Sequence, residues 1–182
     1  MMFGKVCIIG CGLIGSSIAR AIKKNKLAHK VVSSNRSNIT NKKVISLNIA
    51  DDSSSDTKKM VENSDLIIIA TPLSSYKDVI KKIKSSLKEG SIVTDVSSVK
   101  KKVISLIEKK IPKNISWISS HPIAGTEESG PEAGFSELFE NRWCILTPSK
   151  KVNDKDIKLL ETFWKKIGSK VDIMNAKQHD YI

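Results

Sequence analysis

The sequence predicts a doubly wound α/β fold with a mostly parallel sheet, formed by one continuous domain. Short apolar runs alternate with segments of helical period along the chain, which is typical of successive βαβ units. A glycine-rich turn lies between the first apolar run and the first helical segment. Polar side chains follow several later runs, at the sheet edge where open parallel sheets bind ligands.

Composition bounds the class of protein. With 182 residues, 40% of them hydrophobic and 27% charged, the chain suits one large soluble domain. The longest apolar run, residues 66–70, is strand-sized, so no membrane partner is expected. The first residues enter a strand pattern at once, which leaves no room for a signal peptide. Three cysteines without metal-ligand spacing favour reduced thiols, a cytoplasmic location and no metal site.

The net charge of +12 raises the question of nucleic-acid binding. The basic residues are almost all lysines scattered along the predicted helices, and the exceptions are Arg20, Arg36 and Arg142. Proteins that read nucleic acids concentrate arginine on one face. We therefore expect a solvated lysine surface and no nucleic-acid partner, with a positive field that helps to recruit anionic small molecules.

The apolar runs predict the strands in order. A buried strand opens the chain, and the clearest central strand is β-branched in its middle and stopped by Pro72. The predicted strands cover residues 5–9, 31–33, a short stretch near Ile49, 66–70, 91–95, 117–119, 143–146 and 171–174.

Helical periodicity predicts the connecting segments. In the first helix Ile18, Ala21 and Ile22 share one face, and Gly90 follows the helix that carries Tyr76 and Ile80. The predicted helices cover residues 16–24, 41–47 (weakly), 76–87, 99–109 and 157–167. Residues 122–141 are predicted to form a long functional loop, and residues 178–182 resemble the start of a further helix.

The glycine-rich turn is predicted to bind the pyrophosphate of a dinucleotide. Its residues are Gly10, Cys11, Gly12, Leu13, Ile14 and Gly15. In this spacing the first glycine permits a tight turn, the second lets the backbone approach the phosphates, and the third lets helix and strand pack closely. The helix N-terminus supplies free N–H groups. Strand, turn and helix in this order predict a Rossmann-type domain.

The end of the second strand bears on the choice of cofactor. An NAD-binding domain usually carries an acidic residue there for the ribose hydroxyls, whereas this chain has Asn35, Arg36 and Ser37. Asn35 removes a charge that would repel a 2′-phosphate, and the next two residues offer donors to one, so the sequence favours NADP over NAD. An exposed Arg36, with Asn35 still serving NAD, is the alternative.

Three later strand ends carry candidate site residues. Ala70, Thr71 and Pro72 end the central strand and are expected to flank the cofactor, unless the proline only stops the strand. Ser97 and Ser98 follow the next strand; Ser97 is expected beside the cofactor and Ser98 at the substrate oxygen, unless Ser98 caps the following helix. His121 follows the strand after that, where a neutral imidazole suits proton transfer from a substrate hydroxyl; a structural histidine is the alternative.

These segments also carry a resemblance. The run from His121 to Glu127 (HPIAGTE), the strand 143–148, the run 94–100 (TDVSSVK), the glycine turn and the closing His179-Asp180-Tyr181 resemble the prephenate/arogenate dehydrogenase family. The resemblance implies NAD(P)-dependent oxidative decarboxylation of prephenate or arogenate on the route to tyrosine. It implies His121 and Ser98 as catalytic residues, and Thr126 and Glu127 as residues of the substrate pocket.

The resemblance also implies a domain organisation. Family members continue into a helical domain that forms a homodimer and contributes to substrate binding, and we expect that domain to be absent here. Residues 1–174 would be the dinucleotide-binding domain and 175–182 a truncated start of the helical segment, so we expect only feeble turnover by the chain alone. Two rival functions remain open: a non-catalytic dinucleotide-binding module, and another small reductase of the β-hydroxyacid dehydrogenase type.

Overall fold

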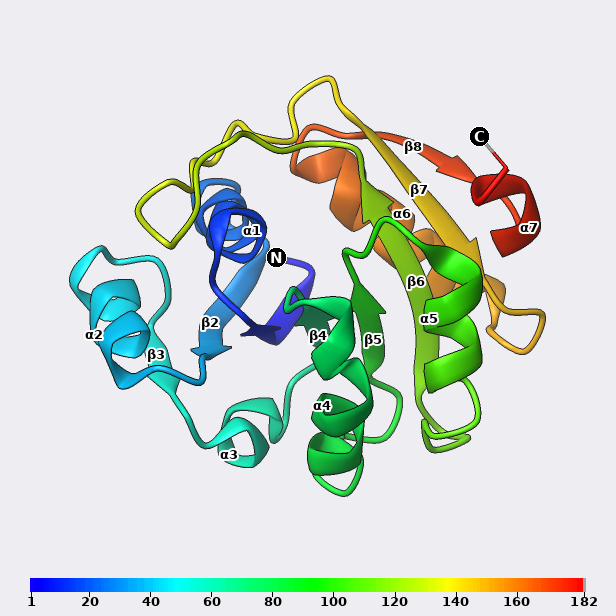
Figure 1. The fold of residues 1–182 in the computed structure, drawn as a ribbon, viewed down its shortest axis with the longest axis horizontal. Helices are drawn as coiled ribbons and strands as arrows, with labels where there is room; N and C mark the ends of the chain where they lie inside the picture. The colour runs from blue at the N-terminus through cyan, green and yellow to red at the C-terminus, as the bar shows by residue number, and fades with distance from the viewer. Residues whose placement is uncertain (182) are drawn as a thin grey trace.

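A computed structural model describes residues 1–181, and Ile182, the last residue of the predicted final helix, lies outside the described residues. The described chain folds around one eight-stranded sheet in the order β3-β2-β1-β4-β5-β6-β7-β8 (Figure 1). The strands are β1 (Phe3–Ile9), β2 (Ala28–Ser34), β3 (Asp52–Ser54), β4 (Leu66–Ile69), β5 (Ile92–Asp95), β6 (Ser116–Pro122), β7 (Trp143–Pro148) and β8 (Lys170–Ile173).

The helices connect these strands and cover both faces of the sheet. They are α1 (Leu13–Lys24), α2 (Asn38–Ser46), α3 (Thr57–Val61), α4 (Tyr76–Ile83), α5 (Lys100–Ile107), α6 (Asp154–Lys166) and α7 (Ala176–His179), with a 3-10 turn over Leu73–Ser75.

The sheet is buried on both sides because alternate strand residues enter two separate cores. In β4, Leu66 and Ile68 pack in one core with α1, α2 and α6. Ile67 and Ile69 pack in the other core with α3, α4 and α5. This explains why the central strand is a continuous apolar run without alternation.

Strands β1 to β6 are parallel, and β7 runs antiparallel to β6. The order 3-2-1-4-5-6 reverses direction between β1 and β4, which is the switch point of a doubly wound Rossmann fold. The predicted fold class is therefore confirmed. At this point the carboxyl ends of β1 and β4 diverge and leave a crevice for a ligand.

The structure departs from the predicted elements at β3 and at α3. The short strand expected near Ile49 is β3, three residues later; Ile49 instead lies in a turn, where its N–H donates to Val44 O at 2.9 Å and its side chain enters the core. Helix α3 was missed because its five residues are too few to show a helical period. Its one local signal is Asp56, whose side chain accepts from the N–H of Lys59.

The long loop between β6 and β7 is fastened over α1. It runs from the end of β6 back across α1 toward α2 (Figure 1). The N–H of Phe135 donates to Ser17 Oγ at 3.1 Å, and a Cβ on Gly134 would lie 2.0 Å from Ser16 Oγ. Buried Leu138 and Phe139 anchor its far end. The loop is thereby held close to the glycine turn.

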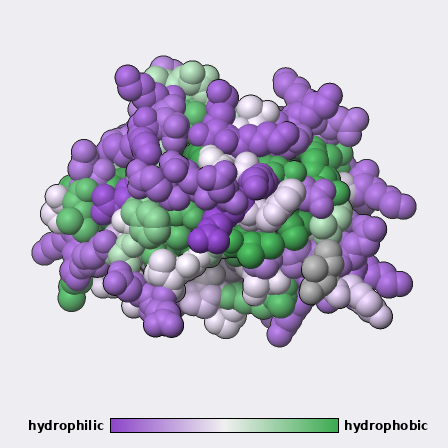
Figure 2. Space-filling view, turned by 90° about the horizontal axis from the view of Figure 1, so that it is seen from above, coloured by the Kyte–Doolittle hydropathy of each residue, from purple (hydrophilic) through white to green (hydrophobic). Residues whose placement is uncertain are grey.

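The surface is polar over much of its area. Figure 2 shows hydrophilic side chains spread across the upper face, with hydrophobic ones between them. Among residues 1–181, no helix combines the length and the apolar character that crossing a membrane requires.

Candidate functional site

The turn between β1 and α1 needs its glycines for different reasons. Gly10 has a φ of +94°, in the left-handed region that favours glycine. A Cβ on Gly15 would lie 2.0 Å from the Gly10 carbonyl oxygen, so α1 approaches the turn this closely only without a side chain. A Cβ on Gly12, the N-cap of α1, would meet no atom within 4 Å. The turn thus combines tight internal packing with an open approach to the free N–H groups of α1.

Asn35 ties the end of β2 to this turn. Its Oδ1 accepts from the N–H of Cys11 at 2.6 Å, and its Nδ2 donates to Asn41 Oδ1 at 3.0 Å and to Ser33 Oγ at 3.2 Å. The side chain is only 7% exposed. The amide that was expected to face the cofactor therefore makes its hydrogen bonds inside the protein and holds the turn in place.

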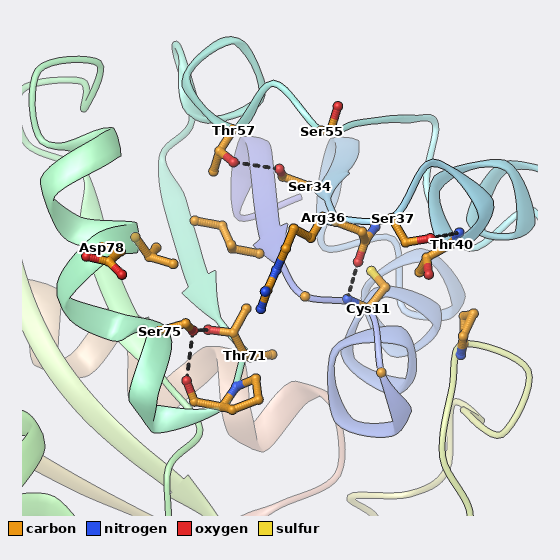
Figure 3. Close-up of a pocket in the computed structure, with 18 of the residues that line it drawn as sticks. Cys11, Ser34, Arg36, Ser37, Thr40, Ser55, Thr57, Thr71, Ser75 and Asp78 are labelled. Atoms are coloured by element: carbon orange, nitrogen blue, oxygen red, sulfur yellow. Dashed lines mark hydrogen bonds between the residues drawn. The ribbon is translucent and has the colours of Figure 1, made fainter.

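A pocket of about 700 Å³ opens at the switch point between β1 and β4 (Figure 3). Its lining includes nine of the predicted cofactor residues: Gly10, Cys11, Gly12, Asn35, Arg36, Ser37, Ala70, Thr71 and Pro72. Four others, Leu13, Ile14, Gly15 and Ser97, lie outside this lining. The ends of β1, β2 and β4 thus meet at one crevice, as their order in the sheet requires.

The pocket also has a polar wall that the sequence did not reveal. Hydroxyl groups and charged side chains from β2, α2, the residue after β3, α3, the 3-10 turn and α4 line it: Ser34, Thr40, Ser55, Thr57, Ser75, Asp78 and Lys82. Gly130 and Pro131 reach it from the long loop. Because these residues come from segments far apart in the chain, only the folded topology brings them together.

Arg36 is, together with Lys82, one of two cationic side chains that line this pocket. Its side chain extends from the end of β2 across the pocket toward the side where Thr71 and Ser75 lie (Figure 3). Within residues 1–181, no carboxylate forms an ion pair with Arg36. Its guanidinium donors are therefore available to an anionic ligand.

Cys11 lines the pocket, yet its side chain is only 1% exposed. Burial raises the pKa of its thiol to about 11, so the thiol is protonated at neutral pH. Cys11 contributes packing and a backbone N–H to the turn. Over the described range 1–181, no cluster of three or more His, Cys, Asp or Glu side chains suits a metal ion.

A buried ion pair joins the ends of β5 and β6. Lys100 Nζ lies 3.1 Å from Asp95 Oδ2, and both side chains are fully buried. Lys100 also donates to Ser119 Oγ at 2.9 Å and to the Ser120 carbonyl at 2.6 Å, and Asp95 accepts from the N–H of Ser97 at 3.0 Å. Burial lowers the pKa of Lys100, and the Asp95 carboxylate opposes this shift. The pair therefore fixes the turn after β5 relative to the end of β6.

His121 lies within β6, not after it as the sequence suggested, because β6 extends to Pro122 by pairing with β7. Its Nδ1 is 2.8 Å from His179 Nε2, and His179 Nδ1 is 2.8 Å from Asp180 Oδ1. Burial, aided by the charge of Lys100, lowers the pKa of the half-buried His121 to about 4. The imidazole is therefore neutral at pH 7, and Nε2 is the ring nitrogen left to accept a hydrogen bond.

The other predicted chemical residues lie near these strand ends. Ser98 is exposed on the turn after β5, and it does not cap α5, whose N-cap is Val99. Thr126 and Glu127 are exposed at the start of the long loop that follows β6. The structure thus places Ser98 and His121 on neighbouring strand ends, with Thr126 and Glu127 a few residues further along the chain.

No local sequence pattern placed His179 and Asp180 in the site. They are 58 residues or more beyond His121, and were noted only as part of a resemblance. Both oxygens of Asp180 accept backbone N–H groups at the start of α5, from Lys100 and Lys101, each at 2.9 Å. The N-cap of α5 is Val99, which offers no side-chain acceptor to the first N–H groups of the helix. This was the one available signal that a residue from elsewhere in the chain caps α5.

Comparison with known proteins gives a consistent result. The profile of the family described as the prephenate dehydrogenase nucleotide-binding domain matches residues 18–173. The chain is 35% identical over 181 residues to the cyclohexadienyl dehydrogenase of Zymomonas mobilis, covering 100% of this chain and 61% of that protein.

Solved structures agree with this match. A prephenate dehydrogenase from Aquifex aeolicus, in complex with hydroxyphenyl propionate and NAD+, superimposes with a TM-score of 0.92 at 30% identity, covering 100% of this chain and 63% of that one. Synechocystis arogenate dehydrogenase gives 0.86 at 25% identity, covering 97% of this chain and 61% of that one. The chain therefore spans less than two thirds of each of these relatives.

The glycine turn generates a prediction about stability. Gly15→Ala should lower the free energy of unfolding by about 1–3 kcal/mol, because its Cβ would meet the Gly10 backbone. Gly12→Ala should cost less than about 1 kcal/mol, since its Cβ enters open space and only the capping preference changes. Urea denaturation of both variants measures the difference. Equal losses would contradict the packing roles assigned to the two glycines.

Proposed function

Because the chain belongs to the prephenate dehydrogenase nucleotide-binding domain family, we propose that it binds a nicotinamide dinucleotide and takes part in oxidative decarboxylation of prephenate or arogenate. The observation that carries this proposal is that one sheet edge holds both the open glycine turn of β1 and the neutral His121 of β6. A dinucleotide site and a hydrogen-bond acceptor thus lie along the same row of strand ends.

The pocket residues fit a dinucleotide. The missing side chain of Gly12 leaves open space in front of the α1 N-terminus, where backbone N–H groups would hold the pyrophosphate. The end of β2 and the start of α3 offer hydroxyls for the adenosine end, and Thr71 and Pro72, which follow β4, flank the way toward β5. A bound nicotinamide would supply a hydride acceptor.

His121 and Ser98 are assigned to the substrate. In the proposed reaction a hydride leaves the ring carbon that bears the hydroxyl, the ring carboxylate departs as carbon dioxide, and the electrons of the broken carbon–carbon bond complete the aromatic ring. His121 Nε2 would accept a hydrogen bond from the hydroxyl, which raises electron density on its oxygen and eases loss of the hydride. Ser98 would hydrogen-bond to the same oxygen, while Thr126 and Glu127 would line the substrate pocket.

We propose NADP as the preferred cofactor. The residue that follows β2 is Asn35, whose amide bonds to Cys11 and Asn41 inside the protein. An asparagine has no carboxylate to bind the ribose hydroxyls or to repel a 2′-phosphate. Arg36 lies in the pocket without an ion-pair partner in the range 1–181, and Ser37 adds a hydroxyl. Charge-assisted bonds from a guanidinium suit a phosphate. The Aquifex relative is solved with NAD+.

The domain boundary at residue 174, the homodimer and the cytoplasmic location stay predictions. They derive from the resemblance and the composition, and the choice between prephenate and arogenate belongs with them.

The cofactor preference is tested by titration. The intact chain should bind NADP+ more tightly than NAD+, and Arg36→Ala should weaken NADP+ binding by on the order of tenfold or more while leaving NAD+ binding nearly unchanged. Arg142→Ala, outside the pocket lining, is the matched control and should change neither. Equal affinities of the intact chain for the two cofactors would reject the preference for NADP.

The role of His121 is tested by turnover. Reduction of NADP+ should be followed with prephenate and with arogenate, for the chain alone and for the chain supplemented with the C-terminal segment of the Zymomonas relative. His121→Asn should lower turnover by on the order of a hundredfold or more, as expected for loss of an acid–base group, and should spare cofactor affinity. Normal turnover by this variant would remove His121 from the mechanism.

A further inference from the structure

Three side chains form a continuous hydrogen-bonded row behind the proposed acceptor. His121 Nδ1 contacts His179 Nε2, and His179 Nδ1 contacts Asp180 Oδ1, each at 2.8 Å. The two imidazole rings meet edge to face, with centroids 5.1 Å apart. The His179 side chain is only 5% exposed, so the central ring of the row is shielded from competing water.

Asp180 is held firmly at the far end of this row. Its two oxygens accept the N–H groups of Lys100 and Lys101, which open α5. Burial alone would raise the pKa of this carboxyl, but these backbone hydrogen bonds and the contact with His179 outweigh it and lower the pKa to about 2. Asp180 is therefore an anionic acceptor throughout the neutral range, fixed by the start of a helix.

The positions of the ring protons follow from this anchor. A carboxylate has no proton to donate, so His179 must carry its proton on Nδ1. A neutral imidazole has one ring proton, which leaves His179 Nε2 as an acceptor. The facing Nδ1 of His121 must then be the donor, and His121 Nε2 is left with a free lone pair.

We propose that His179 and Asp180 are positioning residues that hold His121 in the tautomer with Nδ1 protonated and Nε2 free to accept. The inference deepens the proposed function and rests on it for its purpose, because only this tautomer can accept a hydrogen bond from a substrate hydroxyl through Nε2. Free histidine prefers the opposite tautomer, with its proton on Nε2. Without the row, most of the His121 population would present a donor where the reaction needs an acceptor.

Nitrogen-15 NMR of the histidine rings tests the proposal on the intact chain, without cofactor or substrate. The sequence has three histidines, and exposed His29 serves as the internal reference. At pH 8, above the usual range of imidazole ionisation, His121 and His179 should both be protonated on Nδ1, whereas His29 should favour Nε2. The ratio of tautomers at His121 should differ from that of His29 by on the order of fivefold or more.

Two variants separate positioning from packing. Asp180→Ala removes the acceptor that selects the His179 tautomer, so His179 Nε2 should become the donor and His121 should switch its proton to Nε2. His179→Phe keeps an aromatic ring but removes the acceptor, so the His121 ratio should revert toward that of His29. His29→Phe is the control and should leave the His121 signals unchanged; it also assigns the His29 signals.

A wild-type His121 protonated on Nε2 at pH 8, or averaged between tautomers like His29, would overturn the proposal. So would an Asp180→Ala variant that folds and keeps His121 protonated on Nδ1. These outcomes are distinct from a failure of the proposed function, which would appear as a chain that binds neither NADP+ nor NAD+ while its histidine tautomers are as stated.

Discussion

The buried ion pair between Lys100 and Asp95 is the constraint on which the rest of the site depends. Two opposite charges with no exposed surface are tolerated only when their remaining hydrogen bonds are satisfied. Here those bonds go to Ser119 and Ser120 on β6 and to the turn after β5. Satisfying the pair therefore fixes two neighbouring strand ends relative to each other, and with them Ser98 and His121.

The same region is tied to α5 by a second interaction. Lys100 uses its ammonium for Asp95 and its backbone N–H for Asp180. One residue at the start of α5 thus links the ion pair to the row that ends at His121. Parallel strand order then sets this cluster beside β4, and β4 beside the glycine turn. A dinucleotide lying along the carboxyl edge would pass from the turn toward His121.

Much of this arrangement could be predicted from local patterns, and the remainder could not. A few consecutive residues are enough to predict each of three features: the glycine turn, the central strand and the polar strand ends. Helix α3 is too short to show a period, and β6 extends past its apolar residues only because β7 pairs with it. The inward turn of Asn35 depends on Asn41 and Cys11. The capping of α5 by Asp180 spans 80 residues, so no local pattern announces it.

The most direct measurement is a double-mutant cycle on the ion pair, read by urea unfolding of Asp95→Asn, Lys100→Met and the double variant. Each single change should cost about 3–5 kcal/mol, because it leaves one buried charge without its partner. The loss in the double variant should be smaller than the sum of the two single losses by more than about 1 kcal/mol. Additive losses, or single changes that leave stability intact, would contradict the claim that this pair holds the turn after β5 against the end of β6.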